Sequence, residues 1–104
     1  MSELQLRRPD ALGTRHERSY VEADVEIRVL GPLEVTSAGA DVHLGGRKQR
    51  TVLALLAAEL GKPVTVDALI DGVWGEERTP GARSTLQTYV SNLRAVIGDI
   101  IVRE

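Results

Sequence analysis

The side chains best placed to do chemistry lie in residues 80–97, on one side of a predicted helix. At about 100° per residue, this side carries hydroxyls and amides flanked by two arginines: Arg83, Ser84, Gln87, Thr88, Ser91, Asn92 and Arg94. The segment contains no acidic residue. Amides and hydroxyls pair with base edges or phosphates, and arginine binds guanine or neutralises phosphate, whereas a carboxylate would repel a DNA backbone. The pattern suits a DNA-contacting surface, and an ordinary solvated helix face is the alternative.

The opposite side of the same segment is apolar and predicts where this helix packs. It is formed by Ala82, Leu86, Val90, Leu93 and Ile97, with Tyr89 at its edge. Thr79 followed by Pro80 predicts the helix start, with threonine as the N-cap and proline in the first helical position. Gly98 predicts the stop. We therefore expect a helix over residues 80–97 whose polar side faces outward.

A second group of cations begins another predicted helix, over residues 47–60. Arg47, Lys48 and Arg50 all fall in its first turn. The helix dipole disfavours cations there, so a phosphate or some other compensating group is expected beside them. The preceding Gly45 and Gly46 lack the Gly-x-x-x-x-Gly-Lys-Ser/Thr spacing that wraps a nucleotide, and we reject nucleotide binding.

The first half of the chain predicts a tail and a small sheet. Residues 1–24 mix arginines with acids and show no sustained period, which indicates a flexible tail; a basic arm following a DNA groove is the alternative. Alternating apolar residues then predict antiparallel strands over residues 25–29, 33–36 and 41–44, with a turn after Thr36. The folded domain is expected to cover residues 25–104.

The order of the remaining elements predicts the fold class. Thr65 is positioned to cap a second helix that ends at Gly75, with Trp74 as a core residue rather than a platform for bases. An extended run over residues 100–102 follows the last helix. A sheet, three helices and a final strand are the plan of a winged helix-turn-helix, an α+β fold whose last helix enters the major groove and whose final strands form the wing.

Composition excludes several function classes. The 104 residues include no cysteine, which rules out thiol chemistry, and only two histidines, His16 and His43, so we predict no metal site, no cofactor and no enzyme. No stretch is apolar enough to span a membrane, which favours a cytoplasmic protein. The net charge of -2 makes DNA binding less expected, but residues 47–62 are locally basic.

Four ordered motifs resemble a known family. They are Val29-Leu30-Gly31-Pro32-Leu33-Glu34-Val35, Leu44-Gly45-Gly46-Arg47-Lys48-Gln49-Arg50 leading into Val52-Leu53-Ala54-Leu55-Leu56, Asp67-Ala68-Leu69-Ile70 with Val73-Trp74-Gly75, and Thr85-Leu86-Gln87-Thr88-Tyr89-Val90-Ser91-Asn92-Leu93-Arg94. Over residues 25–103 the chain is similar to the DNA-binding domain of the Streptomyces antibiotic regulatory protein family. The resemblance implies an OmpR/PhoB-type winged helix that binds direct repeats in promoters and activates transcription.

The same resemblance implies roles for particular segments. The helix at residues 80–97 would be the recognition helix, and Arg47, Lys48 and Arg50 would lie near phosphates or the domain's own acids. The loop at residues 75–79 would be the region that can meet RNA polymerase. Family members continue into a second wing strand and a helical activation domain, and the sequence shows neither, so we expect an incomplete C-terminal wing.

An incomplete wing has its own structural consequences. An unpaired final strand predicts a frayed end, pairing with another part of the sheet, or self-association through a second chain. Two function hypotheses remain: a promoter-binding regulator, and a protein-interaction module that kept the fold but lost DNA affinity. Steep salt dependence of binding would distinguish the first from the second.

Overall fold

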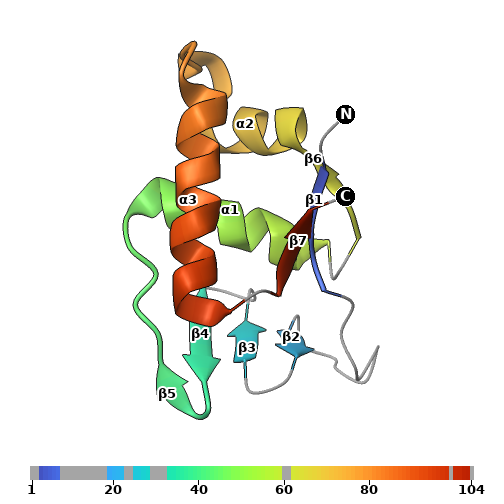
Figure 1. Ribbon diagram of the computed structural model, residues 1–104, viewed down its shortest axis with the longest axis vertical. Helices are drawn as coiled ribbons and strands as arrows, with labels where there is room; N and C mark the ends of the chain where they lie inside the picture. Colours follow the sequence, from blue (N-terminus) through green and yellow to red (C-terminus); the bar gives the residue numbers. More distant parts are fainter. Residues whose placement is uncertain are drawn as a thin grey trace.

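The computed structural model describes residues 3–7, 19–22, 25–28, 33–59, 62–98 and 100–103, with the backbone alone for residues 19–22 and 103. Strands come first along the chain, and the helices follow them, with one short strand between the first two helices and another after the last one (Figure 1). The elements are β1 (Glu3–Leu6), β2 (Ser19–Glu22), β3 (Val25–Arg28), β4 (Glu34–Ser37), β5 (Ala40–Asp41), α1 (Arg47–Ala58), β6 (Val64–Thr65), α2 (Val66–Trp74), the 3-10 helix η1 (Gly75–Glu77), α3 (Ala82–Ile97) and β7 (Ile101–Arg103).

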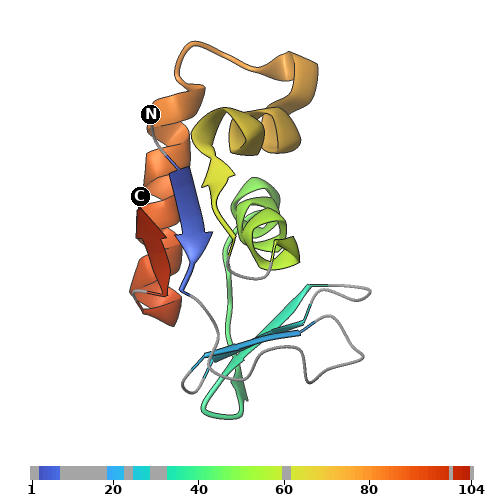
Figure 2. The same cartoon turned by 90° about the vertical axis from the view of Figure 1, so that its right-hand side faces the viewer.

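Two sheets and three helices surround one core. The four-stranded sheet has the order β2-β3-β4-β5 and lies below the helices, while the three-stranded sheet has the order β6-β1-β7 and runs alongside α3 (Figure 2). α1 packs against both α2 and α3. No helix in the described part of the chain is long and apolar enough to cross a membrane.

The four-stranded sheet confirms the predicted alternation. Ile27 pairs with Val35 across the β3 and β4 strands, and both side chains are buried in the core. The predicted turn follows Ser37, where Ala38 and Gly39 both have positive φ (53° and 84°), as a two-residue hairpin turn requires. The predicted strand at residues 41–44 is shorter than expected, because the chain leaves the sheet after Asp41 to reach α1. Residues 29–32, which include the end of the first predicted strand, lie outside the described residues.

The predicted flexible tail is wrong for two segments. Residues 3–6 form β1, the central strand of its sheet, and residues 19–22 form β2 at the edge of the other. Leu4 and Leu6 are only 5% and 0% exposed, so their burial in the core fixes β1 in place. The sequence does not predict β1 because a segment of four residues with two leucines is too short to show a clear alternation within a charged stretch. The rest of that segment, including the arginines of the proposed basic arm at positions 8, 15 and 18, lies outside the described residues.

The helices follow the prediction except at one start. The Thr65 hydroxyl accepts a hydrogen bond from the Ala68 amide (3.0 Å), which confirms the predicted cap of α2. The predicted start of the last helix is wrong by two residues. The Ala82 amide donates to the Thr79 carbonyl (3.0 Å), so Pro80 and Gly81 are the central pair of a turn and α3 begins at Ala82.

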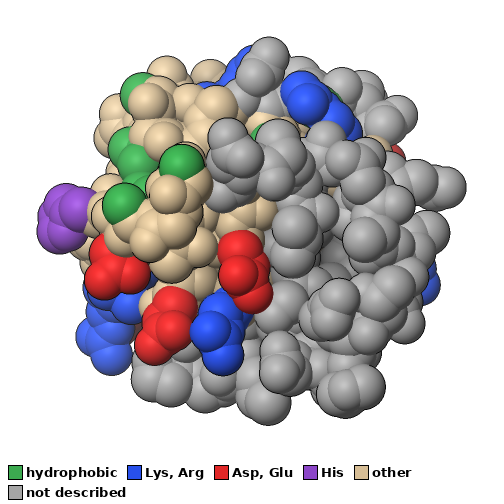
Figure 3. Space-filling view, turned by 90° about the horizontal axis from the view of Figure 1, so that it is seen from below, with side chains coloured by type: hydrophobic (Ala, Val, Ile, Leu, Met, Phe, Trp, Pro, Cys, Tyr) green, Lys and Arg blue, Asp and Glu red, His purple; other side chains and the backbone are tan. Residues whose placement is uncertain are grey.

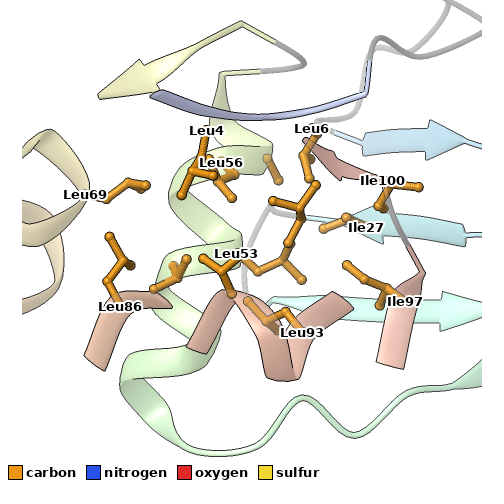
Figure 4. Packing of buried hydrophobic residues seen from close by; sticks show 14 of the residues in the cluster. Leu4, Leu6, Ile27, Leu53, Leu56, Leu69, Leu86, Leu93, Ile97 and Ile100 are labelled. Carbon is orange, nitrogen blue, oxygen red and sulfur yellow. The ribbon is translucent and has the colours of Figure 1, made fainter. Parts of the chain in front are cut away.

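The core joins every layer (Figure 4). Leu53 of α1 lies between Leu86 and Leu93 of α3 on one side and Leu6 of β1 on the other. At the edge of this core the Trp74 ring stacks on Tyr89, with centroids 6.0 Å apart and planes at 10°. Trp74 is partly buried against the cluster, as the sequence predicted.

Replacing Leu6 tests whether β1 is part of the core. We expect Leu6→Ala to lower the free energy of unfolding by about 2–5 kcal/mol, because it deletes fully buried methyl groups and leaves a cavity. Val96→Ala is the matched control, since Val96 is 42% exposed. Urea unfolding followed by circular dichroism measures both variants; equal stabilities would show that residues 3–6 do not belong to the fold.

Candidate nucleic-acid interface

The polar side of α3 is open to solvent, as the sequence predicted. Ala82, Leu86, Val90, Leu93 and Ile97 are each 4% exposed or less and turn toward the core. The predicted site residues of this helix are all exposed: Arg83, Ser84, Gln87, Thr88, Ser91, Asn92 and Arg94. In Figure 2, α3 forms the left edge of the molecule, with α1 and α2 on its other side. The described part of the chain therefore leaves the outer side of α3 uncovered.

Asn92 differs from its neighbours because it is bonded to α1. Its Nδ2 donates to Oε1 of Gln49 (3.1 Å), and Nε2 of Gln49 donates to the Leu44 carbonyl (2.7 Å). Gln49 is only 9% exposed, so both ends of its amide are satisfied inside the protein. We conclude that Asn92 helps to fix α3 against α1.

Gln49 is not among the site residues predicted from the sequence, although its position carries a signal. Gln49, Leu53 and Leu56 follow helical spacing, so a polar residue occupies the apolar side of α1. A buried amide needs hydrogen-bond partners, which predicts a contact with a neighbouring element.

Arg83 lies at one end of a group of exposed ion pairs. Its Nη2 is 3.5 Å from Oδ1 of Asp67, in the first turn of α2. Arg78 bridges the same Asp67 oxygen (3.5 Å) and Oδ1 of Asp71 (3.3 Å). These side chains are 45% to 71% exposed, so the pairs are screened by solvent and a phosphate can compete for the arginines.

The remaining polar side chains of α3 point outward without a partner on another element. Thr88 bonds only within the helix, through its hydroxyl to the Ser84 carbonyl (3.4 Å). The side chains of Ser84, Gln87, Ser91 and Arg94 make no hydrogen bond or ion pair within the described residues. Ser84, Gln87, Thr88, Ser91 and Arg94 recur at spacings of three and four, so they share one helix side. We call these five residues the outer face of α3.

The cations at the start of α1 are exposed, and the first turn supplies no group that would offset their positive charge. The first turn holds no acid, and Gly46 provides no side-chain cap. Arg47, Lys48 and Arg50 are exposed, and Nη2 of Arg50 donates a long bond (3.4 Å) to the Leu33 carbonyl. An open depression of about 420 Å³ lies between Leu33 and these arginines. The predicted anion beside this turn therefore stays a prediction.

The two predicted groups are brought near each other. The bond from Asn92 to Gln49 joins the first turn of α1 to the second half of α3, so the turn that carries the α1 cations lies beside α3. The lower face of the molecule differs from the outer face of α3, because acidic and basic side chains alternate on the described part of the lower face (Figure 3). A polar surface without acids, flanked by cations, is suited to a polyanion.

Comparison with known proteins identifies the domain. Residues 39–103 match the family model described as "Transcriptional regulatory protein, C terminal". The chain belongs to this family. Its winged-helix fold agrees with a solved structure of Mycobacterium tuberculosis EmbR in complex with a low-affinity phosphopeptide, at 46% identity and a TM-score of 0.67 over 71% of this chain and 20% of that one.

Sequence relatives belong to the family that the motifs predicted. The transcriptional regulatory protein EmbR of Mycobacterium tuberculosis is 46% identical over 75% of this chain and 20% of its own length. The regulatory protein DnrI of Streptomyces peucetius is 41% identical over 67% of this chain and 26% of its own. The resemblance to the Streptomyces antibiotic regulatory protein family is confirmed. The chain spans about a fifth to a quarter of these relatives' length.

The link between α1 and α3 can be tested by a double-mutant cycle. We expect Gln49→Ala and Asn92→Ala each to destabilise the domain, and their coupling free energy to be about 0.5–1.5 kcal/mol because the two amides bond directly. Urea unfolding of the wild type, both single variants and the double variant gives the coupling. Ser91→Ala, which changes the neighbouring residue on the outer face, is the control; additive effects of Gln49→Ala and Asn92→Ala would contradict the bond.

Proposed function

We propose that the domain binds double-stranded DNA and places the outer face of α3 in the major groove. The observation that carries the proposal is the group of unpartnered polar side chains on this face, set on a helix without acids. A helix inserted in the major groove reads base edges through amides, hydroxyls and arginines of this kind. Gln87 and Ser91, near the middle of the face, are assigned to bases, and Arg94 to guanine or phosphate.

The other predicted residues are assigned to positioning and to phosphates. Asn92 supports α3 through Gln49. Arg83 binds a DNA phosphate, which takes the place of the Asp67 carboxylate in the ion pair. Arg47, Lys48 and Arg50 contact the backbone beside the groove, where phosphate would also compensate the helix dipole. Ser84 and Thr88 complete the polar face.

The promoter role rests on the relatives. EmbR and DnrI are named as regulatory proteins, so we propose that this domain regulates transcription from promoters in the cytoplasm. Direct repeats are the proposed target, since two domains on repeated half-sites bind more tightly than one. RNA polymerase is the proposed second partner, and the exposed η1 segment with Glu76 and Glu77 is the surface offered to it.

A protein-interaction module is the second candidate. The net charge of -2 and the pairing of Arg83 with Asp67 both reduce the attraction for DNA. In this alternative the outer face of α3 would contact a protein, and binding would depend weakly on salt.

Replacing Arg94 tests the outer face. We expect Arg94→Ala to weaken binding to a GC-rich promoter fragment by about tenfold or more, because one arginine contact to guanine is worth about 1–3 kcal/mol. Arg28→Ala is the control of equal charge, since Arg28 is exposed on β3 in the sheet below α3. Fluorescence anisotropy measures both; equal losses would remove the outer face from the DNA interface.

A lysine pair separates the two candidate functions. We expect Lys48→Ala to reduce the slope of log affinity against log salt by about 1, because one phosphate contact is lost. Lys62→Ala, also exposed but beyond the other end of α1, should leave the slope unchanged. Binding without salt dependence in the wild type would favour the interaction module instead.

A further inference from the structure

The three-stranded sheet contains a site for a strand that comes from elsewhere in the chain. β6 and β7 lie on either side of β1 and both run antiparallel to it. The pairs are Glu3 with Thr65, Leu4 with Val64 and Arg103, Gln5 with Val102, and Leu6 with Ile101. We call the space between β6 and β7 the strand site. Without β1, two strand edges would face each other unpaired.

The strand site cannot stay empty at low cost. Leu4 and Leu6 fill the core beside Leu53 and Leu56 (Figure 4), and removing them would expose those side chains to water. The Arg7 amide also donates to the Ile100 carbonyl and extends the ladder by one residue. Any strand that fits must therefore supply two apolar residues in alternation.

β1 is held to the rest of its own molecule by a long connection. The next strand, β2, lies in the other sheet, and residues 7–18 join the two. A connection of this length spans up to roughly 40 Å when extended, while the whole molecule measures 39 × 25 × 24 Å. The covalent reach thus allows β1 to enter the strand site of a neighbouring copy.

Two further observations distinguish β1 from the strands that form its site. The family match covers residues 39–103, which contain β6 and β7 but not β1. The Oε1 atom of Gln5 is buried without a hydrogen-bond partner, a defect that lowers the free energy of opening β1. The strand therefore lies outside the matched region, and one of its buried polar atoms is unsatisfied in the strand site.

We propose that β1 exchanges between two copies of this chain and links them as a dimer. In the dimer, residues 3–6 of each copy fill the strand site of the other and make the same pairs that they make here. The contacts are conserved on exchange, so the balance depends on protein concentration and on the connection. A reciprocal exchange relates the copies by a two-fold axis and joins two α3 helices in one particle.

Cysteine pairs can detect the exchange directly because the wild-type chain contains no cysteine. Gln5 pairs with Val102, and opposed residues on antiparallel strands lie close enough for a disulfide. Gln5→Cys and Val102→Cys are prepared as separate variants, unfolded together at high concentration, refolded and oxidised in a glutathione buffer. We expect a disulfide between the two variants, and a species of twice the 11.3 kDa chain mass on a non-reducing gel.

Two controls fix the meaning of each outcome. The chain carrying both cysteines, refolded at low concentration, should form the bond within one molecule; no bond would refute the register on which the proposal rests. Mixing Gln5→Cys with Ser91→Cys, on the outer face of α3, should give little linked product. The proposal is overturned if the double variant closes within the chain while the mixed single variants stay unlinked or link no better than the Ser91→Cys control.

Discussion

The packing of α3 against α1 is the interaction on which the rest of the structure depends. Leu86 and Leu93 contact the core around Leu53, and this contact fixes which side of α3 faces outward. Apolar packing alone allows several orientations of two helices, whereas hydrogen bonds are directional. The bond to the Leu44 carbonyl orients the buried Gln49 amide, and the bond from Asn92 then favours one arrangement of α3 against α1. Rotating α3 by a quarter turn would bury polar residues of its outer face and break the bond from Asn92 to Gln49.

The same packing explains how the cations of α1 come to lie beside α3. Gln49 lies in the first turn of α1 with Arg47, Lys48 and Arg50, so the bond that fixes α3 also holds the turn that carries these charges beside α3. The net charge of -2 does not reveal these local cations. Asp67 of α2 pairs with Arg78 and Arg83 and not with the cations of α1. The local field beside α3, rather than the total charge, decides what the surface attracts.

Helical spacing was enough to predict the three helices and the buried side of α3. The five apolar residues from Ala82 to Ile97 repeat over several turns, and such long patterns are reliable. Short elements were not predictable in the same way. β1 has two leucines in four residues, and its partners β6 and β7 have two and three residues, so its place depends on contacts distant in sequence. The start of α3 was missed because Pro80 suits a turn as well as a first helical turn. For the site, the sequence indicated which side chains of α3 are exposed, but the partners of Arg83 and Asn92 required three dimensions.

Amide chemical shifts of the labelled domain, recorded while a duplex promoter fragment is added, report which helix enters the DNA groove. We expect the largest changes on α3 at Gln87, Ser91 and Arg94 and on the first turn of α1, with small changes on β3 and β4. Changes confined to α2 and η1, with α3 unaffected at saturating DNA, would contradict the assignment of the outer face of α3 to the major groove.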